Sequence, residues 1–359
     1  MAQIDQFLKV LAEKGGSDLH LTTGSPPMMR LHGELQAFPF RELTPKDMEK
    51  LVYEIMEEDW RMTFLDRRDF DFAYEIAGVA RFRANVFWQR KGLGAVFRTI
   101  PSEILTADDL NLPDVVRKFG MLSKGLVLVT GPTGSGKSTT LAAIIDLINE
   151  TRKDHILTIE DPIEFTHPNK TCLVNQREIG SHTKSFAAAL KAALREDPDV
   201  ILVGEMRDRE TIELGITAAE TGHLVFGTLH TNSAPKTVDR IIDVFPADQQ
   251  EQIRSMLAES LKGVVSQVLM RKKDGKGRVA AMEIMVGTSA VANLIRENKL
   301  HQIPSIIQTG KKDGMQLLDQ HILEFLMSGA IDAREAYMRS HNKQAFAQYL
   351  EEEPEEEFV

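Results

Sequence analysis

From about residue 114 onward, short continuous apolar runs alternate with segments whose apolar residues recur at helical spacing. An uninterrupted apolar run is typical of a strand buried on both faces, and helical spacing is typical of a helix that packs on such a sheet. Strands are predicted at 125–130, 155–159, 200–204 and 224–229, and helices at 139–150, 185–196 and 208–221. This alternation predicts an α/β core built around a mostly parallel sheet.

Residues 1 to 100 have a different pattern, with short strands and fewer helices. Thr44 and Pro45 fit the N-cap and the first position of a helix. A threonine hydroxyl can accept a hydrogen bond from a backbone N–H of the first turn, and the backbone N–H that proline lacks would have no partner within the helix at that position. Helices are predicted near 4–14 and 45–56, strands near 17–21, 69–74, 80–87 and 95–100, and a hairpin-like pair of short strands at 29–35. This pattern predicts an α+β domain at 1–100, a linker at 101–113 and the larger α/β domain at 114–359.

Beyond about residue 247 the pattern becomes mainly helical, with one predicted strand near 279–286. The run 271–278 is basic and contains glycine, which favours a solvated hairpin turn over a binding surface. Residues 351–359 are rich in glutamate. We expect this acidic tail to be disordered, because it has too little apolar surface to bury.

The strongest chemical signal is a glycine-rich stretch between the first buried strand and the helix after it. It fits G-x-x-x-x-G-K-[ST], a loop whose backbone N–H groups surround a polyphosphate at the start of a helix. The stretch and the residue after it are Gly131, Pro132, Thr133, Gly134, Ser135, Gly136, Lys137, Ser138 and Thr139. Lys137 is predicted to reach the β- and γ-phosphates, and Ser138 to bind the Mg²⁺ that bridges them. ATP and Mg²⁺ are therefore the predicted ligands; a glycine-rich connection that binds nothing fits this context less well.

Carboxylates follow two other buried strands, at the edge where open α/β sheets bind ligands. Glu205 has the position of an acid that approaches Mg²⁺ directly or through water. Three more carboxylates follow the predicted strand 155–159, those of Glu160, Asp161 and Glu164. Carboxylates this close together repel one another unless a cation lies among them. Glu164 is the first choice for activating the hydrolytic water, Glu205 is the second, and Glu160 is a further candidate near Mg²⁺. Solvated acidic turns are the alternative.

His223 and His230 lie at the two ends of the predicted strand 224–229. Their odd spacing puts them on opposite faces of an ideal strand, which argues against a metal ion shared between them. Beside a nucleotide, His230 could contact the γ-phosphate, and His223 is a second candidate for such a role. A purely structural role is the alternative for each.

The composition is 42% hydrophobic and 27% charged, which is ordinary for a globular protein. No apolar run is long enough to span a bilayer, and the N-terminus lacks a signal-peptide pattern, so we expect a cytoplasmic location. Cys172 is the only cysteine, which excludes an intrachain disulfide and a cysteine-cluster metal site. The net charge of −10 argues against a nucleic-acid partner.

Together, these motifs resemble the PilT family of type IV pilus retraction ATPases, within the secretion-ATPase superfamily. Besides the phosphate loop, the matching segments are GSDLHL (16–21), TIEDPIE (158–164), VGEMRD (203–208), TGH (221–223), TLHTN (228–232) and ANLIRE (292–297). The last segment resembles the family motif AIRNLIRE, but Ala292 replaces its first arginine. A single cysteine also excludes the cysteine-rich insert of the related pilus-assembly and type II secretion ATPases.

The resemblance implies a RecA-like P-loop ATPase domain preceded by a smaller PAS-like α+β domain. It implies a homohexamer that hydrolyses ATP to power pilus retraction and twitching motility. Such a ring would act on a platform protein at the inner face of the cytoplasmic membrane and would associate with the membrane only through that partner. A pilus-extension or type II secretion ATPase, a nucleic-acid translocase and a regulator that binds nucleotide without hydrolysing it are the alternatives.

Arginines of the N-terminal domain are the last candidates. Arg81 and Arg83 alternate with aromatic residues, so both are expected on the polar face of a strand, and alone they fit a solvated face as well as a ligand site. The resemblance implies that arginines at these positions, together with Arg98, reach the phosphates of the nucleotide.

Overall fold

The computed structural model describes residues 2–31, 33–100 and 103–350. The chain divides into two compact units, each with its own core. The first comprises Met1–Glu103 and Pro162–Thr166, and the second comprises Ile104–Asp161 and His167–Val359. Each unit is described separately below. The predicted acidic tail at 351–359 lies outside the described residues.

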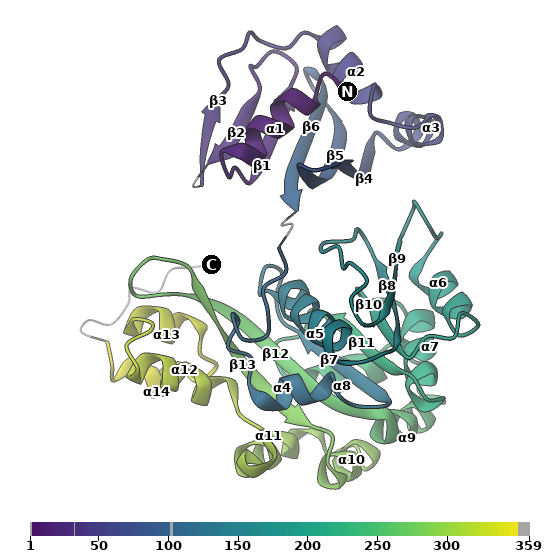
Figure 1. Ribbon diagram of the computed structural model, residues 1–359. Helices are drawn as coiled ribbons and strands as arrows, with labels where there is room; N and C mark the ends of the chain where they lie inside the picture. Colours follow the sequence, from purple (N-terminus) through teal and green to yellow (C-terminus); the bar gives the residue numbers. More distant parts are fainter. Residues whose placement is uncertain (1, 32, 101–102, 351–359) are drawn as a thin grey trace. The chain divides into compact units, whose positions relative to one another are not determined.

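The first unit contains a six-stranded antiparallel sheet with strand order β3-β2-β1-β6-β5-β4 (Figure 1). Its strands are β1 (Asp18–Thr22), β2 (Met28–Leu31), β3 (Glu34–Ala37), β4 (Asp69–Ile76), β5 (Ala80–Gln89) and β6 (Gly92–Ile100), and its helices are α1 (Asp5–Glu13), α2 (Pro45–Tyr53) and α3 (Glu58–Arg67). One face of the sheet is apolar because alternate residues such as Leu19, Phe82 and Phe97 point into the core, where they are fully buried.

Helix α2 begins as its sequence predicts. The Thr44 hydroxyl accepts the backbone N–H of Asp47, and the Asp47 carboxylate accepts the backbone N–H of Thr44, which completes a capping box. Helix α3 was not predicted. Phe64 is its only buried residue, so it lacks the apolar stripe by which a helix is recognised in a sequence.

The second unit is built on a seven-stranded sheet with strand order β13-β12-β7-β11-β10-β8-β9. Its strands are β7 (Gly125–Thr130), β8 (His155–Glu160), β9 (Leu173–Glu178), β10 (Val200–Val203), β11 (Leu224–Leu229), β12 (Leu261–Arg271) and β13 (Arg278–Val286). The strands from β12 to β9 are parallel, and only the edge strand β13 is antiparallel. The predicted α/β core with a mostly parallel sheet is therefore confirmed.

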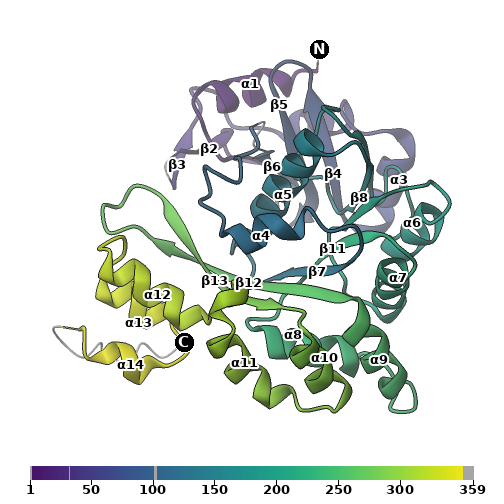
Figure 2. The same ribbon diagram turned by 60° about the horizontal axis from the view of Figure 1, so that its bottom comes forward.

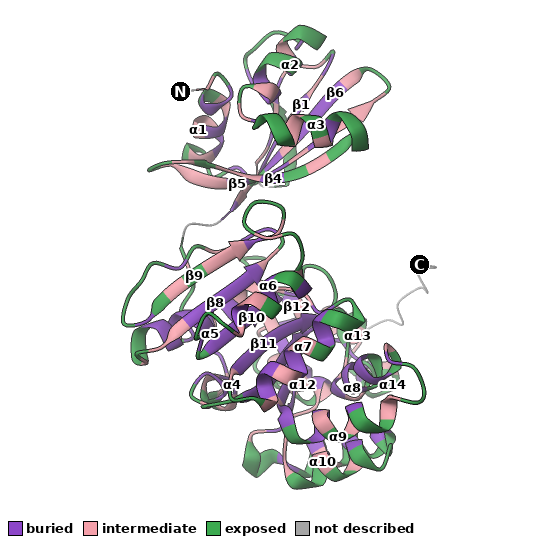
Figure 3. Cartoon of the chain, turned by 90° about the vertical axis from the view of Figure 1, so that its right-hand side faces the viewer, coloured by how far each residue is buried: buried purple, intermediate pink, exposed green. Residues whose placement is uncertain are grey.

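Helices cover both faces of this sheet (Figure 2). They are α4 (Asp114–Phe119), α5 (Lys137–Thr151), α6 (Phe186–Ala193), α7 (Arg209–Glu220), α8 (Ala234–Asp243), α9 (Gln250–Ser260), α10 (Ser289–Arg296), α11 (Ile303–Thr309), α12 (Leu318–Met327), α13 (Ala333–Arg339) and α14 (Lys343–Ala347). Leu126 and Leu128 of β7 pack in the cluster that includes α7 and α9, whereas Val127 and Val129 pack in the cluster that includes α4 and α5. The central strands are consequently buried throughout (Figure 3).

The mainly helical prediction beyond residue 247 is wrong for 261–271, which form β12. Val264, Val265 and Val268 favour a strand, and β7 supplies a parallel partner that the local sequence does not reveal. The hairpin prediction is confirmed, because Arg271 pairs with Arg278 across the turn. Strand β9, at the other edge of the sheet, was also missed.

Residues from Ile104 to Pro113, which we expected within a linker, form part of the second unit. Ala107 and Leu112 are buried in the same cluster as α5. Within the described residues, no helix is both long enough and apolar enough to span a bilayer.

Candidate nucleotide site

The carboxyl ends of four neighbouring parallel strands bring most of the predicted residues of the second unit to one edge of its sheet. The phosphate loop follows β7, His230 follows β11, Glu205 follows β10 by two residues, and Glu160 ends β8. The strands are neighbours in the order β7-β11-β10-β8. Because neighbouring strands lie about 4.8 Å apart, this row of strand ends spans about 14 Å.

The phosphate loop depends on glycine at its beginning and its end. Gly131 has φ +138° and Gly136 has φ +87°, a backbone region that side chains rarely adopt. A Cβ on Gly131 would lie 2.2 Å from the carbonyl oxygen of Gln267 on β12. Glycine is therefore required both for the turn and for the close approach of β12.

The start of α5 and two buried polar side chains, Lys137 and Ser135, make the loop suitable for binding a polyphosphate. The Lys137 ammonium donates to the carbonyl oxygens of Gly131, at 2.9 Å, and Pro132, at 3.1 Å, which holds it over the loop. The Ser135 side chain is buried, and its hydroxyl has no hydrogen-bond partner within the described part of the chain. Phosphate oxygens could accept from both groups and from the N–H groups at the start of α5.

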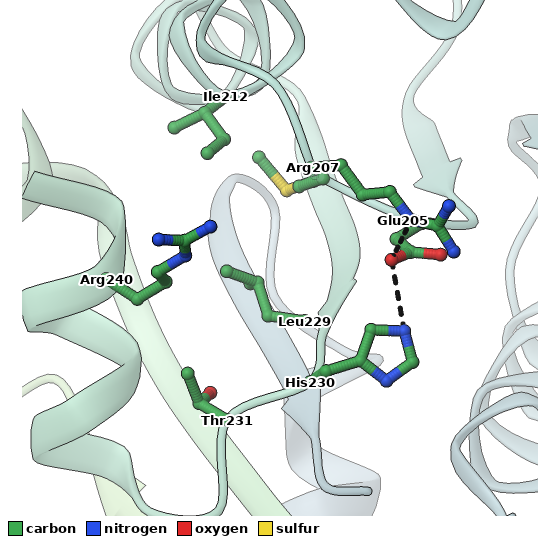
Figure 4. A pocket seen from close by; sticks show the side chains of 8 residues that line it. Glu205, Arg207, Ile212, Leu229, His230, Thr231 and Arg240 are labelled. Carbon is green, nitrogen blue, oxygen red and sulfur yellow. Dashed lines mark hydrogen bonds and ion pairs between the residues drawn. The ribbon is translucent and has the colours of Figure 1, made fainter. Parts of the chain in front are cut away.

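The carboxylate of Glu205 lies between the side chains of Arg207 and His230 (Figure 4). Its Oε1 lies 3.0 Å from His230 Nε2 and accepts a hydrogen bond from Arg207 Nε. The Met206 backbone N–H donates to the Thr228 carbonyl oxygen at 3.0 Å, which ties the end of β10 to β11. The Glu205 side chain is 18% exposed, so water can still reach it.

A cavity of about 390 Å³ adjoins this ion-pair cluster. It is lined by Glu205, Met206, Arg207, Ile212, Leu229, His230, Thr231 and Arg240 (Figure 4). The lining includes neither Lys137 nor Ser138, so this cavity is not the phosphate-binding site of the loop. The Glu205–His230 pair lines a separate cavity at the same edge of the sheet.

Glu160 is fixed by neighbours on its own strand and on β9. The Thr158 hydroxyl donates to its carboxylate at 2.7 Å, and the Gln176 amide donates at 3.3 Å. Glu164 lies in the segment 162–166, which belongs to the first unit. Glu160 and Glu164, which we expected at the end of one strand, thus belong to different units.

Comparison with known proteins identifies the family. Residues 103–351 match the family described as Type II/IV secretion system protein. The chain is 56% identical to the Pseudomonas aeruginosa type IV pilus retraction ATPase PilT, over 93% of this chain and 96% of that protein. The structure matches a crystal structure of the pilus retraction motor PilT with bound ADP, with a TM-score of 0.89, 48% identity and coverage of 96% and 98% of the two chains. This chain belongs to the PilT family of pilus retraction ATPases.

More distant relatives agree with this assignment. A twitching motility protein of Neisseria gonorrhoeae is 54% identical over 89% of this chain and 86% of that protein. The Legionella pneumophila ATPase DotB has a TM-score of 0.77 at 30% identity and covers 93% of this chain and 94% of its own. The family resemblance inferred from the motifs is confirmed, and so is the RecA-like fold class that it implied.

The two histidines of this PilT-family chain lie at opposite edges of the sheet. His223 precedes β11, and Leu224 pairs with Gly125 at the start of β7, so His223 lies about 20 Å from the end of the strand that carries the loop. Its Nδ1 is 2.9 Å from the Ala218 carbonyl oxygen, at the end of α7. Within one chain, therefore, the fold brings His230 to the loop edge and leaves His223 away from it.

The three candidate arginines share the polar face of the sheet in the first unit. Arg83 on β5 lies directly opposite Arg98 on β6, and Arg81 follows on the same face two residues away. Arg83 pairs with Asp71 at 3.6 Å and Arg98 with Asp18 at 2.9 Å. Burial raises the pKa of Asp18, but hydrogen bonds from Ser17 and Arg98 outweigh it and keep the pKa below its usual value.

Sequence reasoning missed Gln267, which contacts the phosphate loop from β12. Its region was predicted as helical, so its position beside the loop could not be inferred. A polar residue inside an apolar run was the available signal, because a buried amide in a strand needs specific partners.

Proposed function

We propose that this chain is a motor that hydrolyses ATP to power type IV pilus retraction and twitching motility. The observation that carries the proposal is the complete phosphate loop at the strand ends of a chain 56% identical to a pilus retraction ATPase. The buried Ser135 hydroxyl, which has no hydrogen-bond partner among the described residues, and the glycine turns support nucleotide binding independently of the relatives. ADP in the related PilT crystal structure supports the same ligand class.

The loop backbone, Lys137 and Ser138 would hold the phosphates and Mg²⁺. Within the described residues, no cluster of three or more histidine, cysteine or acidic side chains forms a metal site. This fits Mg²⁺, which is commonly held by one or two protein oxygens together with phosphates and waters. When bound, Mg²⁺ would neutralise phosphate charge, with Glu205 and Glu160 reaching it directly or through water.

Two carboxylates are candidates for activating the hydrolytic water, Glu164 and Glu205. The pairing of Glu205 with His230 gives this carboxylate a fixed orientation at the loop edge. We propose that His230 contacts the γ-phosphate and that Arg81, Arg83 and Arg98 supply positive charge to the phosphates. His223 is the second candidate for contact with the phosphates, and within a single chain it lies at the opposite edge of the sheet.

We further propose that the chain works as a homohexamer on an inner-membrane platform protein, at the cytoplasmic face of that membrane. A domain that brings arginine onto a γ-phosphate can adopt different positions before and after hydrolysis. Six such switches in a ring could turn the platform and remove pilins from the fibre.

A deletion strain separates this function from the nearest alternatives. Loss of a retraction motor leaves cells heavily piliated but unable to retract, as imaging of labelled fibres would show. Cells without pili would indicate an extension ATPase, and a defect limited to protein export would indicate a secretion ATPase.

Purified protein separates the remaining alternatives. ATPase activity stimulated by DNA would indicate a translocase, whereas the net charge of −10 predicts no stimulation. Complementation with Glu164→Gln and with Glu205→Gln tests the non-hydrolysing regulator, because a variant that keeps ATP bound without turnover would retain that function. We expect the variant that lacks the base to restore no retraction, and Lys137→Ala, which also loses a phosphate contact, to restore none either.

A further inference from the structure

Gln267 lies on β12 at the point where β7 leaves the sheet to form the phosphate loop. Ser266 pairs with Thr130, the last residue of β7, so Gln267 is the next residue along and lies beside the loop. Its side chain is almost completely inaccessible, since the residue is 2% exposed. An amide this deeply buried is costly unless both its ends are hydrogen-bonded.

Both ends of the amide are paired, and both partners belong to the nucleotide-binding segment. Gln267 Nε2 donates to the Ser135 carbonyl oxygen at 2.7 Å. Gln267 Oε1 accepts from the Thr140 hydroxyl at 3.0 Å. The side chain therefore connects the middle of the loop to the first turn of α5.

The backbone of the same residue lies against the beginning of the loop. The Gln267 carbonyl oxygen would be 2.2 Å from a Cβ on Gly131, and its Nε2 would be 3.2 Å from a Cβ on Gly136. One residue of a neighbouring strand thus lies close to the loop at its start and its end, and hydrogen-bonds to its middle. Moving Ser135 or Thr140 away from β12 would break one of the two hydrogen bonds of the amide.

We propose that Gln267 is a positioning residue that holds the phosphate loop in its nucleotide-binding shape. The inference rests on the proposed function in one respect, namely that this loop binds nucleotide. A loop that already has its binding shape loses less conformational freedom when phosphates bind. The affinity of the protein for the nucleotide is therefore higher. Gln267 makes the same contacts with the loop in the substrate complex and in the transition state. Its loss should therefore weaken nucleotide binding more than it lowers kcat.

The first test compares Gln267→Met with Gln316→Met in the full-length chain. Methionine keeps the length of the side chain but removes both hydrogen bonds. Gln316 is the matched control, because its amide also donates to a backbone carbonyl, that of Met282 at 2.9 Å, which lies on the strand opposite Gln267 and not in the loop. We expect Gln267→Met to weaken binding of a fluorescent ADP analogue about 10-fold, to raise the KM for ATP similarly and to change kcat less than about 3-fold.

The second test uses Gln267→Glu and distinguishes a hydrogen bond from simple packing. A protonated carboxyl can donate to the Ser135 carbonyl oxygen, whereas a carboxylate can only repel it. Relative to wild type at each pH, this variant should bind the ADP analogue more weakly as the pH rises. Gln267→Met should show no such trend, since its side chain does not titrate.

The outcomes separate this inference from the proposed function. If wild-type protein binds the ADP analogue and both Gln267 variants bind it equally well, the positioning role is wrong. If wild-type protein binds no nucleotide at all, the proposed function fails first. Should Gln267→Met not fold, Thr140→Val removes one of the two hydrogen bonds with little change of shape; unchanged affinity in that variant would also overturn the inference.

Discussion

At the scale of single residues, the most informative feature is the environment of Glu205. Arg207 and His230 both bind one oxygen of its carboxylate, so its orientation is fixed from two sides. A carboxylate whose direction is set by neighbours can hold a water molecule in one position, which is what a general base requires. The same contacts also fit a carboxylate that only supports the Mg²⁺ region, and substitution distinguishes the two roles.

Glu205→Gln and Glu164→Gln, made separately, test which carboxylate activates water. The amide keeps the size of the side chain but cannot accept a proton, so the variant that removes the base should lose about 100-fold or more in kcat. Nucleotide affinity should change little in that variant, because the phosphate loop is intact. ATP turnover and binding of an ADP analogue are the measurements.

Glu196→Gln is a suitable control, since it removes a carboxylate that pairs with Arg177 within the same unit. Full turnover in both test variants would show that neither Glu164 nor Glu205 is the base.

At the level of secondary-structure elements, the sequence predicted the strands and helices that the local pattern of apolar residues determines. Strands β7, β10 and β11 are mainly apolar runs, β8 has a mainly apolar centre, and the helices between them have clear periodicity, so the site edge that they form could be predicted. Strand β12 was missed although Val264, Val265 and Val268 favour a strand, because the parallel partner that fixes its place, β7, is remote in sequence. The same error concealed Gln267. Long-range pairing, rather than local propensity, limited the prediction of the site.

The connection between β8 and β9 should make stability depend on pH through His167. Burial lowers the pKa of this side chain from 6.5 to about 4. Between these values the unfolded chain binds a proton that the folded chain does not, so stability present above pH 6.5 is lost as the pH falls towards 4. The loss attributable to His167 is at most about 3 kcal/mol.

The measurement compares wild type with His167→Gln, which should lose stability less steeply over this pH range. Trp60 and Trp88 both belong to the first unit, so unfolding of the second unit is better followed by far-UV circular dichroism than by tryptophan fluorescence. His301→Gln, at an exposed histidine, is the matched control for the loss of one imidazole. Identical pH slopes in wild type and His167→Gln would contradict the assignment.

At the scale of the whole molecule, the question is how the two units and several copies of the chain act together. The first unit holds the candidate arginines and Glu164, and the second holds the phosphate loop, His230 and Glu205. Candidate catalytic groups are thus divided between two folded bodies. In the proposed homohexamer, each copy would act with its neighbours on one platform, so inactive copies should impair active ones.

Mixing active and inactive copies tests this directly. Lys137→Ala should not turn over ATP, because it removes the ammonium that lies over the loop. If the chain forms the proposed hexamer, equal amounts of both forms would leave only about one ring in sixty entirely wild type. We therefore expect co-expression of Lys137→Ala to reduce the frequency of pilus retraction far below half, as measured by fibre imaging. A reduction in simple proportion to the wild-type share would mean that the copies act independently. Size-exclusion chromatography of Lys137→Ala controls for assembly, since a variant that cannot join the ring would also spare the wild-type protein.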